Sequence, residues 1–246
     1  MCLRDGTAAS LSIKRFLLSV LLVLAIAWVP IALAQASDEA VREAVVLNPD
    51  KPGFYRIGTA FHVGGGVFYT NAHVVRTKVP EGYTQWYLAG ASSTKRRDTW
   101  LGPATITCVH PRWRGSRESD DVEPFDVATM KIDSRSDLPP ALTLTNRTPL
   151  VGTNVTIKGF ASASLGWPPK LYTATGRVSE LSQSEQAFAI DIESGFALEG
   201  SSGSPVLDGE GHVVGIVFAR SGERDRSAAA HVVAITVAGM NECPIR

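Results

Sequence analysis

Residues 199–219 read EGSSGSPVLDGEGHVVGIVFA, and this stretch holds the pattern that decides the fold. Two short runs of apolar and β-branched residues, SPVLD and HVVGIVFA, flank turn-forming residues at 208–211. A pair of short apolar runs around a glycine-rich turn is typical of two antiparallel strands. The stretch therefore predicts a β-hairpin.

The same kind of run recurs along most of the chain. Eleven short β-rich runs are separated by Gly, Pro, Asn and Asp, a pattern that predicts an all-β sandwich or barrel. No period of about 20 to 50 residues repeats, which disfavours a propeller or a solenoid. The runs are RIGTAFHV, GVFYTNAHVV, TQWYLAG, ATITCVH, DVATMKI, NVTIKGF, LYTATGRVSEL, FAIDIE, SPVLD, HVVGIVFA and AAHVVAITV.

A proline-rich stretch divides these runs into two groups of similar size. Residues 134–151 contain Pro139, Pro140 and Pro149. Proline cannot donate a hydrogen bond within a central sheet, so this stretch is predicted to connect two β units, at about 50–135 and about 152–240. A short helix is predicted earlier, at residues 37–46, where SDEAVREAVV has a cap and an apolar stripe at helical spacing.

The N-terminal 36 residues have the order of a secretory signal peptide. Lys14 and Arg15 precede an apolar run from Phe16, and small residues follow to Ala36. We expect cleavage after residue 34 or 36 and a mature domain at residues 37–246, placed in the periplasm or outside the cell. The alternative is an uncleaved membrane anchor, since residues 16–33 are just long enough to span a bilayer.

Composition and charge exclude several classes of protein. The 246 residues are 44% hydrophobic and 20% charged, which argues against a mostly disordered chain. The 24 basic and 24 acidic residues cancel, so the net charge gives no overall attraction to nucleic acid or to an anionic membrane. Without residues 1–36 the domain keeps 21 basic and 23 acidic residues.

Two cysteines remain in the predicted mature domain, Cys108 and Cys243. They can form a disulfide in an oxidising compartment, or they can be two buried free thiols. The sequence leaves both alternatives open, because it does not give the separation of the two Cα atoms.

Three segments carry residues suited to nucleophilic chemistry. Ser202 stands between glycines in GSSGSP, where a tight turn can aim several backbone N–H groups at one point. His73 ends an apolar run in TNAHVV, and Asp126 begins the alternating run FDVATMKI. A buried carboxylate needs a partner, and an imidazole whose tautomer must be fixed is a suitable one.

GTAFHV with TNAHVV, then FDVATMKI, then EGSSGSPV followed by HVVGIVFA, resembles the trypsin-like (chymotrypsin-fold) serine peptidases, in particular their bacterial glutamyl-endopeptidase and HtrA-type branches. The resemblance implies two six-stranded antiparallel β-barrels with the active site in the cleft between them. It implies that His73 is the general base, Asp126 its orienting carboxylate and Ser202 the nucleophile, with the N–H groups of Gly200 and Ser202 as the oxyanion hole.

The resemblance also implies a protein or peptide substrate, and neither a cofactor nor a metal ion. We expect a preference for a small or medium apolar residue before the scissile bond. Only 44 residues follow Ser202, so we expect no peptide-binding PDZ module of the kind that HtrA-type proteins carry. The sequence does not indicate an oligomeric state. The residues expected to line the primary pocket are Ala197, Val217, Phe218, Ala219 and His231.

One position departs from the animal digestive members of this family. They carry an aspartate directly before the nucleophile, which pairs with a newly exposed N-terminus, whereas this chain has Ser201. We therefore expect activity without a precise N-terminal cut beyond signal removal. Two alternatives to a peptidase remain, a catalytically silent barrel that binds peptides and an esterase that uses the same triad.

Overall fold

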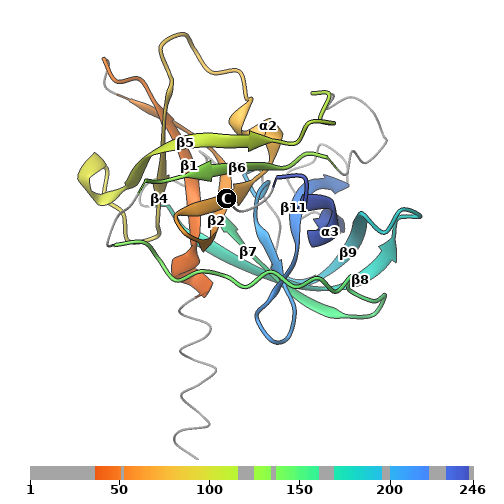
Figure 1. The fold of residues 1–246 in the computed structure, drawn as a ribbon. Coiled ribbons are helices and arrows are strands. Elements are labelled where there is room, and N and C mark those ends of the chain that lie inside the picture. The colour runs from red at the N-terminus through yellow and green to blue at the C-terminus, as the bar shows by residue number, and fades with distance from the viewer. Residues whose placement is uncertain are drawn as a thin grey trace, which may run out of the picture. The chain divides into compact units, whose positions relative to one another are not determined.

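The computed structural model describes residues 37–50, 53–115, 125–133, 137–160, 169–195, 200–221 and 231–243. Within them, twelve strands form two closed six-stranded barrels whose neighbouring strands pair antiparallel (Figure 1). The predicted signal peptide, residues 1–36, lies outside the described residues. No helix among the residues described is long and apolar enough to cross a membrane.

The first barrel is built by the strands coloured orange to light green in Figure 1. Around the barrel the strands are β1 (Val41–Leu47), β2 (Phe54–Gly64), β3 (Val67–Thr70), β6 (Ala128–Lys131), β5 (Leu101–Val109) and β4 (Gln85–Ala89). A four-residue helix, α2 (Ala72–Val75), follows β3, and a 3-10 turn, η1 (Arg97–Thr99), precedes β5.

The second barrel takes the later strands, coloured green to blue in Figure 1. Around it the strands are β10 (Pro205–Leu207), β11 (Val213–Ser221), β12 (His231–Thr236), β9 (Ala187–Ser194), β8 (Leu171–Leu181) and β7 (Asn154–Phe160). The chain then forms α3 (Val237–Met240), where the Thr236 hydroxyl caps the helix by accepting a bond from the Gly239 N–H at 3.3 Å.

The start of the first barrel differs from the prediction. The helix expected at residues 37–46 forms only at 37–40, and β1 begins at Val41, earlier than the boundary expected near residue 50. Strand β1 pairs with β2 on one side and with β4 on the other, and nearly all of its side chains are buried. Pairing in the closed barrel therefore outweighs the helical spacing of its apolar residues.

Each barrel has its own apolar core, and a third cluster joins the two barrels. That cluster includes Phe61 and Tyr69 of the first barrel and Phe160 and Ile216 of the second, all at most 2% exposed. Because the cluster contains side chains from both barrels, it fixes one barrel against the other.

The C-terminal residues fasten the second barrel to the first. Cys243, just after α3, forms a disulfide with Cys108 of β5, with a Cα–Cα distance of 5.6 Å. The hydroxyl of Tyr69 in β3 donates to the carbonyl of Cys243 at 2.5 Å. Of the two alternatives for the cysteines, the structure has the disulfide.

The connector runs between the barrels without a strand of its own in residues 137–150, apart from a single bridge of Leu144 to Val213. Residues 134–136 lie outside the described part. His62 of β2 holds the connector through its Nδ1 atom, 2.8 Å from the carbonyl of Pro139. His62 therefore has a structural role.

Candidate active site

His73 and Asp126 meet at one end of the first barrel. His73 lies in α2, directly after β3, and Asp126 lies just before β6, the strand that pairs with β3. The Asp126 carboxylate bonds both to Nδ1 of His73 and to the His73 backbone N–H, the latter at 2.7 Å. The Asp126 side chain is 2% exposed and the His73 side chain is 14% exposed. With Nδ1 bound to the carboxylate, the Nε2 lone pair of a neutral imidazole is left to accept a proton.

Asn71 holds this pair from behind. It is fully buried, and its side-chain NH₂ group donates to the backbone carbonyl of Asp126 at 2.7 Å. The backbone carbonyl oxygen of Asn71 accepts a hydrogen bond from the Val74 N–H at 3.2 Å, in the turn that opens α2. The side-chain oxygen of Asn71 has no partner among the described residues. Asn71 thus ties the backbone before Asp126 to the helix that carries His73.

Ser202 lies in a tight turn in front of β10. The Ser204 N–H donates to the Ser201 carbonyl at 3.0 Å, which closes a four-residue turn with Ser202 and Gly203 at its centre. Gly203 has φ of +87°, and a Cβ on it would lie 1.9 Å from the carbonyl oxygen of Thr59. Both the backbone conformation and the space therefore require glycine at 203.

Hydrogen bonds from both barrels hold this turn. The Gly203 N–H donates to the Val217 carbonyl at 2.9 Å, and the Val217 N–H donates to the Ser204 carbonyl at 2.8 Å. From the first barrel, the Thr59 N–H donates to the Ser202 carbonyl at 2.8 Å. The nucleophile candidate is thus attached to β2 as well as to β11.

Gly58 brings the two parts of the site together. A Cβ on Gly58 would lie 2.8 Å from a methyl group of Val74 and 3.0 Å from the Ser202 carbonyl oxygen. The helix of His73 and the turn of Ser202 therefore both contact β2 at this glycine. Within the described residues, the Ser202 hydroxyl and the His73 ring form no hydrogen bond to each other.

Gly200, the other residue expected in the oxyanion hole, has φ of +97°. Its carbonyl accepts from the Thr59 hydroxyl at 3.1 Å, and that hydroxyl accepts from the Phe160 N–H at 2.9 Å. Because this carbonyl is held by Thr59, the peptide unit that follows Gly200 has a fixed orientation. Residues 196–199, which lead into Gly200, lie outside the described part.

The residues expected to line the specificity pocket are placed only in part. Ala197 lies outside the described residues. Val217 is 2% exposed and belongs to the core of the second barrel, while Phe218 packs half-buried against the cluster between the barrels. Ala219 lies in β11. His231 begins β12 and is exposed, and its Nδ1 lies 2.6 Å from a carboxylate oxygen of Asp191.

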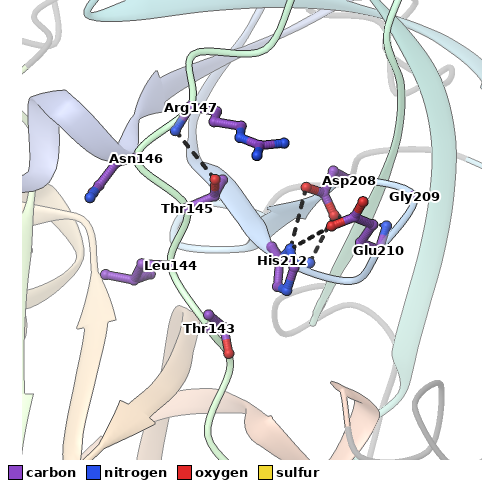
Figure 2. Close-up of a pocket in the computed structure, with 9 residues that line it drawn as sticks. All are labelled: Thr143, Leu144, Thr145, Asn146, Arg147, Asp208, Gly209, Glu210 and His212. Carbon is purple, nitrogen blue, oxygen red and sulfur yellow. Dashed lines mark hydrogen bonds and ion pairs between the residues drawn. The ribbon is translucent and has the colours of Figure 1, made fainter.

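A separate pocket of about 510 Å³ lies between the connector and the β10–β11 turn (Figure 2). Asp208, Glu210 and His212 converge on its rim, with His212 Nδ1 3.3 Å from Glu210 and 3.8 Å from Asp208. These groups could together ligate a metal ion, but they contain none of the residues proposed for catalysis. The expectation of no metal stays a prediction.

Sequence reasoning missed three residues that hold the site. Thr59 and Asn71 lie inside the segments GTAFHV and TNAHVV, which the family resemblance had already marked. Their roles were not predictable, because their hydrogen-bonding partners lie far along the chain. The third is Tyr172 of β8, whose hydroxyl lies 3.4 Å from that of Ser204. No local pattern in the sequence distinguishes this tyrosine.

Two closed six-stranded antiparallel barrels define the fold of the chymotrypsin-like serine peptidases. A family model described as the trypsin-like peptidase domain matches residues 58–216, and the chain belongs to this family. A search of curated proteins finds no match.

Solved structures of proteases are similar to this chain in fold. The active form of the Rv3671c protease from M. tuberculosis has 20% sequence identity and a TM-score of 0.56, over 84% of this chain and 80% of that chain. An inactive form of that protease has 19% identity and a TM-score of 0.55, over 85% and 88%. The HtrA-type protease AlgW, solved with a decapeptide, has 19% identity and a TM-score of 0.56, over 84% and 63%.

Proposed function

We propose that this protein is a serine endopeptidase that cleaves protein or peptide substrates through Ser202, His73 and Asp126. The observation that carries the proposal is the buried Asp126 carboxylate, which bonds both Nδ1 and the backbone N–H of His73. The helix that carries this ring and the turn that carries Ser202 both contact Gly58. The family to which the chain belongs supports a peptidase.

The reaction proceeds in two stages. The Ser202 oxygen attacks the scissile carbonyl carbon while Nε2 of His73 takes the hydroxyl proton, and the resulting oxyanion accepts hydrogen bonds from the N–H groups of Gly200 and Ser202. The C–N bond then breaks, and His73 returns the proton to the leaving amine. A water molecule attacks the acyl-enzyme by the same route, which releases the carboxylic acid and restores the serine.

Labelling by a fluorophosphonate tests this proposal, because the probe forms a covalent bond only with an activated serine. Wild type should be labelled, Ser202→Ala should not, and His73→Ala should lose most of the labelling rate. Ser184→Ala, in an exposed turn, is the matched control and should label like wild type. A wild type that folds but resists the probe would indicate a silent barrel.

Assays with amide and ester substrates on the same purified protein distinguish a peptidase from an esterase. A peptidase should cleave a peptide library internally, at a rate that disappears in Ser202→Ala. Turnover of esters with no cleavage of any peptide would instead assign an esterase. A library that shows a strict preference for Glu or Arg before the cleaved bond would contradict the expected apolar preference.

We also propose that the protein acts outside the cytoplasm. The order of charged, apolar and small residues in 1–36 supports export, and the Cys108–Cys243 disulfide supports an oxidising compartment. N-terminal sequencing of the protein recovered from cell fractions tests this. A start at residue 35 or 37 in the periplasm or medium is expected, and a start at Met1 in the cytosol would contradict it.

A further inference from the structure

A group of three hydroxyls lies behind the Ser202 turn, on the side of the second barrel. We call the side chains of Tyr172, Ser201 and Ser204 the hydroxyl cluster. The Tyr172 hydroxyl lies 3.4 Å from that of Ser204, and the Ser201 side chain is close enough to lower the pKa of the same hydroxyl. Ser201 and Ser204 are 5% and 0% exposed. One phenol therefore contacts both ends of the turn whose centre carries Ser202.

A glycine in β7 makes room for this cluster. Gly159 pairs with Tyr172 across β7 and β8. A Cβ on Gly159 would lie 1.9 Å from the Ser204 hydroxyl oxygen and 3.0 Å from the Tyr172 hydroxyl oxygen. Any side chain at 159 would thus push the two hydroxyls out of place. The cluster is a built feature of three neighbouring segments, rather than an accidental approach of two exposed side chains.

Ser201, one member of the cluster, stands where the resemblance implies the aspartate of an ion pair in animal digestive members of the family. The residue before the nucleophile is their aspartate and is Ser201 here, so a hydroxyl replaces a carboxylate. A buried hydroxyl needs a hydrogen-bonding partner, and because it carries no charge itself, an uncharged partner is sufficient. The phenol of Tyr172 supplies that partner from within the folded barrel and requires no new N-terminus.

We infer that Tyr172 is a positioning residue that holds the Ser201–Ser204 turn, and with it the Ser202 hydroxyl and N–H group, in the geometry needed for acylation. This inference rests on the proposed function, since it assigns Tyr172 a role toward Ser202. Tyr172 acts from the second barrel, while Thr59 holds the Ser202 and Gly200 carbonyls from the first. Together they fix both sides of the turn.

The phenol is suited to this role at neutral pH. Burial raises the pKa of Tyr172, and the hydrogen bonds with Ser204 and Ser201 only partly oppose that rise. The hydroxyl therefore stays protonated and keeps its donor proton at neutral pH. A phenolate here would place a negative charge next to the turn that carries the proposed oxyanion hole, and the raised pKa avoids this.

The test compares Tyr172→Phe with Tyr69→Phe in the full chain. Both remove one phenol hydroxyl, but the Tyr69 hydroxyl bonds to the Cys243 carbonyl at the C-terminal anchor. Tyr172→Phe should lower kcat for a peptide substrate by about 5- to 30-fold, the equivalent of one hydrogen bond, with KM within about twofold. Tyr69→Phe should leave kcat within about twofold even where it lowers stability.

A double-mutant cycle separates positioning from general loosening. Ser204→Ala should also lower kcat, and the pair Tyr172→Phe with Ser204→Ala should be no slower than the slower single variant, because both remove the same contact. Gly159→Ala should also lower kcat, because the added methyl group would push the Ser204 and Tyr172 hydroxyls apart while both hydroxyls remain present.

Several results would overturn the inference. Equal kcat values for Tyr172→Phe and wild type, strictly additive effects in the cycle, or a rise in KM alone would each do so. Circular dichroism at the assay temperature confirms that each variant is folded. Failure of the proposed function is distinguishable, because it would appear in the wild type itself as absent labelling, or as labelling that survives Ser202→Ala.

Discussion

The two halves of the proposed active site are held in place by different means. On the first barrel, a single buried carboxylate orients His73 through two hydrogen bonds, and Asn71 fixes the backbone of that carboxylate. On the second barrel, neutral hydroxyls and backbone groups hold the turn of Ser202. The His73 half therefore depends on one charged group, whereas the Ser202 half depends on several weak hydrogen bonds together.

This difference has a consequence for mutation. Loss of the one carboxylate should destroy the function of its half, because no other group among the described residues bonds to the imidazole. Loss of any single bond around the turn should cause a smaller decline, since the remaining bonds still restrain it. Substitutions in the two halves, and in the structures that join them, test this contrast.

Asp126→Asn should produce the largest effect. The amide cannot stabilise an imidazolium, and its NH₂ group favours the wrong tautomer of His73, so kcat/KM should fall by about 10⁴-fold. Peptide hydrolysis at a fixed pH near 8 measures it. Asp98→Asn, which removes the carboxylate of an exposed pair with Arg96, is the control and should change kcat/KM by less than about twofold. A loss below about tenfold for Asp126→Asn would contradict the proposed role of Asp126.

The disulfide joins the two barrels, and its removal should chiefly change stability. Cys108→Ala with Cys243→Ala opens a link between residues 135 positions apart, which should lower the free energy of unfolding by about 2–5 kcal/mol. Urea denaturation measures the change, and wild type treated with a reductant should approach the double variant. Below the unfolding transition, kcat should stay within about twofold of wild type. Unchanged stability would show that the apolar cluster between the barrels suffices to join them.

Much of the fold could be predicted because its signal is local. All eleven β-rich runs overlap a strand, from β2 to β12. The missed strand, β1, has apolar residues at helical spacing, and it becomes a strand because β2 and β4 pair with both of its edges. That pairing brings together residues far apart in sequence, which a local pattern does not record.

The site shows the same limit. His73, Asp126 and Ser202 stand in short segments whose residue types indicate their chemistry. Tyr172 stands 32 residues before Ser204 and reaches it only because Gly159, in the neighbouring strand, has no side chain. A contact that depends on a gap in a third segment leaves no pattern around the tyrosine itself. Supporting residues of this kind become visible only in the folded barrel.

Thr59→Val should have an intermediate effect on the Ser202 half. Valine has nearly the shape of threonine but leaves the Gly200 carbonyl and the Phe160 N–H without the hydroxyl that now bonds to both. We expect kcat to fall about 10- to 100-fold, since one or two buried hydrogen bonds are lost. Thr59→Ser keeps the hydroxyl and should stay within about threefold of wild type. Equal losses in the two variants would mean that the methyl group, and not the hydroxyl, supports the turn.

The smallest effect is expected at a second buried carboxylate in the first barrel. Because this carboxylate has no proposed catalytic role, it shows what burial alone does to a carboxylate. Glu43 of β1 accepts two bonds from the Arg56 guanidinium, at 2.7 and 2.8 Å, and the Glu43 side chain is 1% exposed. Burial raises the pKa of Glu43 to about 7, and the charge and hydrogen bonds of Arg56 oppose the rise. Unlike Asp126, this carboxylate has no proposed role in the reaction.

The sign of the pH dependence follows from that rise. The ordinary pKa of 4.5 applies in the unfolded chain, so between pH 4.5 and about 7 the folded protein binds more protons than the unfolded chain. The contribution of Glu43 to stability is therefore full below 4.5 and is lost as pH rises through 7. Subtracting the unfolding free energy of Glu43→Gln from that of wild type should give a difference that falls by about 1–3 kcal/mol from pH 4.5 to 8. A difference that rises with pH would show that the bonds to Arg56 outweigh burial and that Glu43 is ionised throughout. In either case kcat of Glu43→Gln should match wild type, because Glu43 has no proposed role in the reaction.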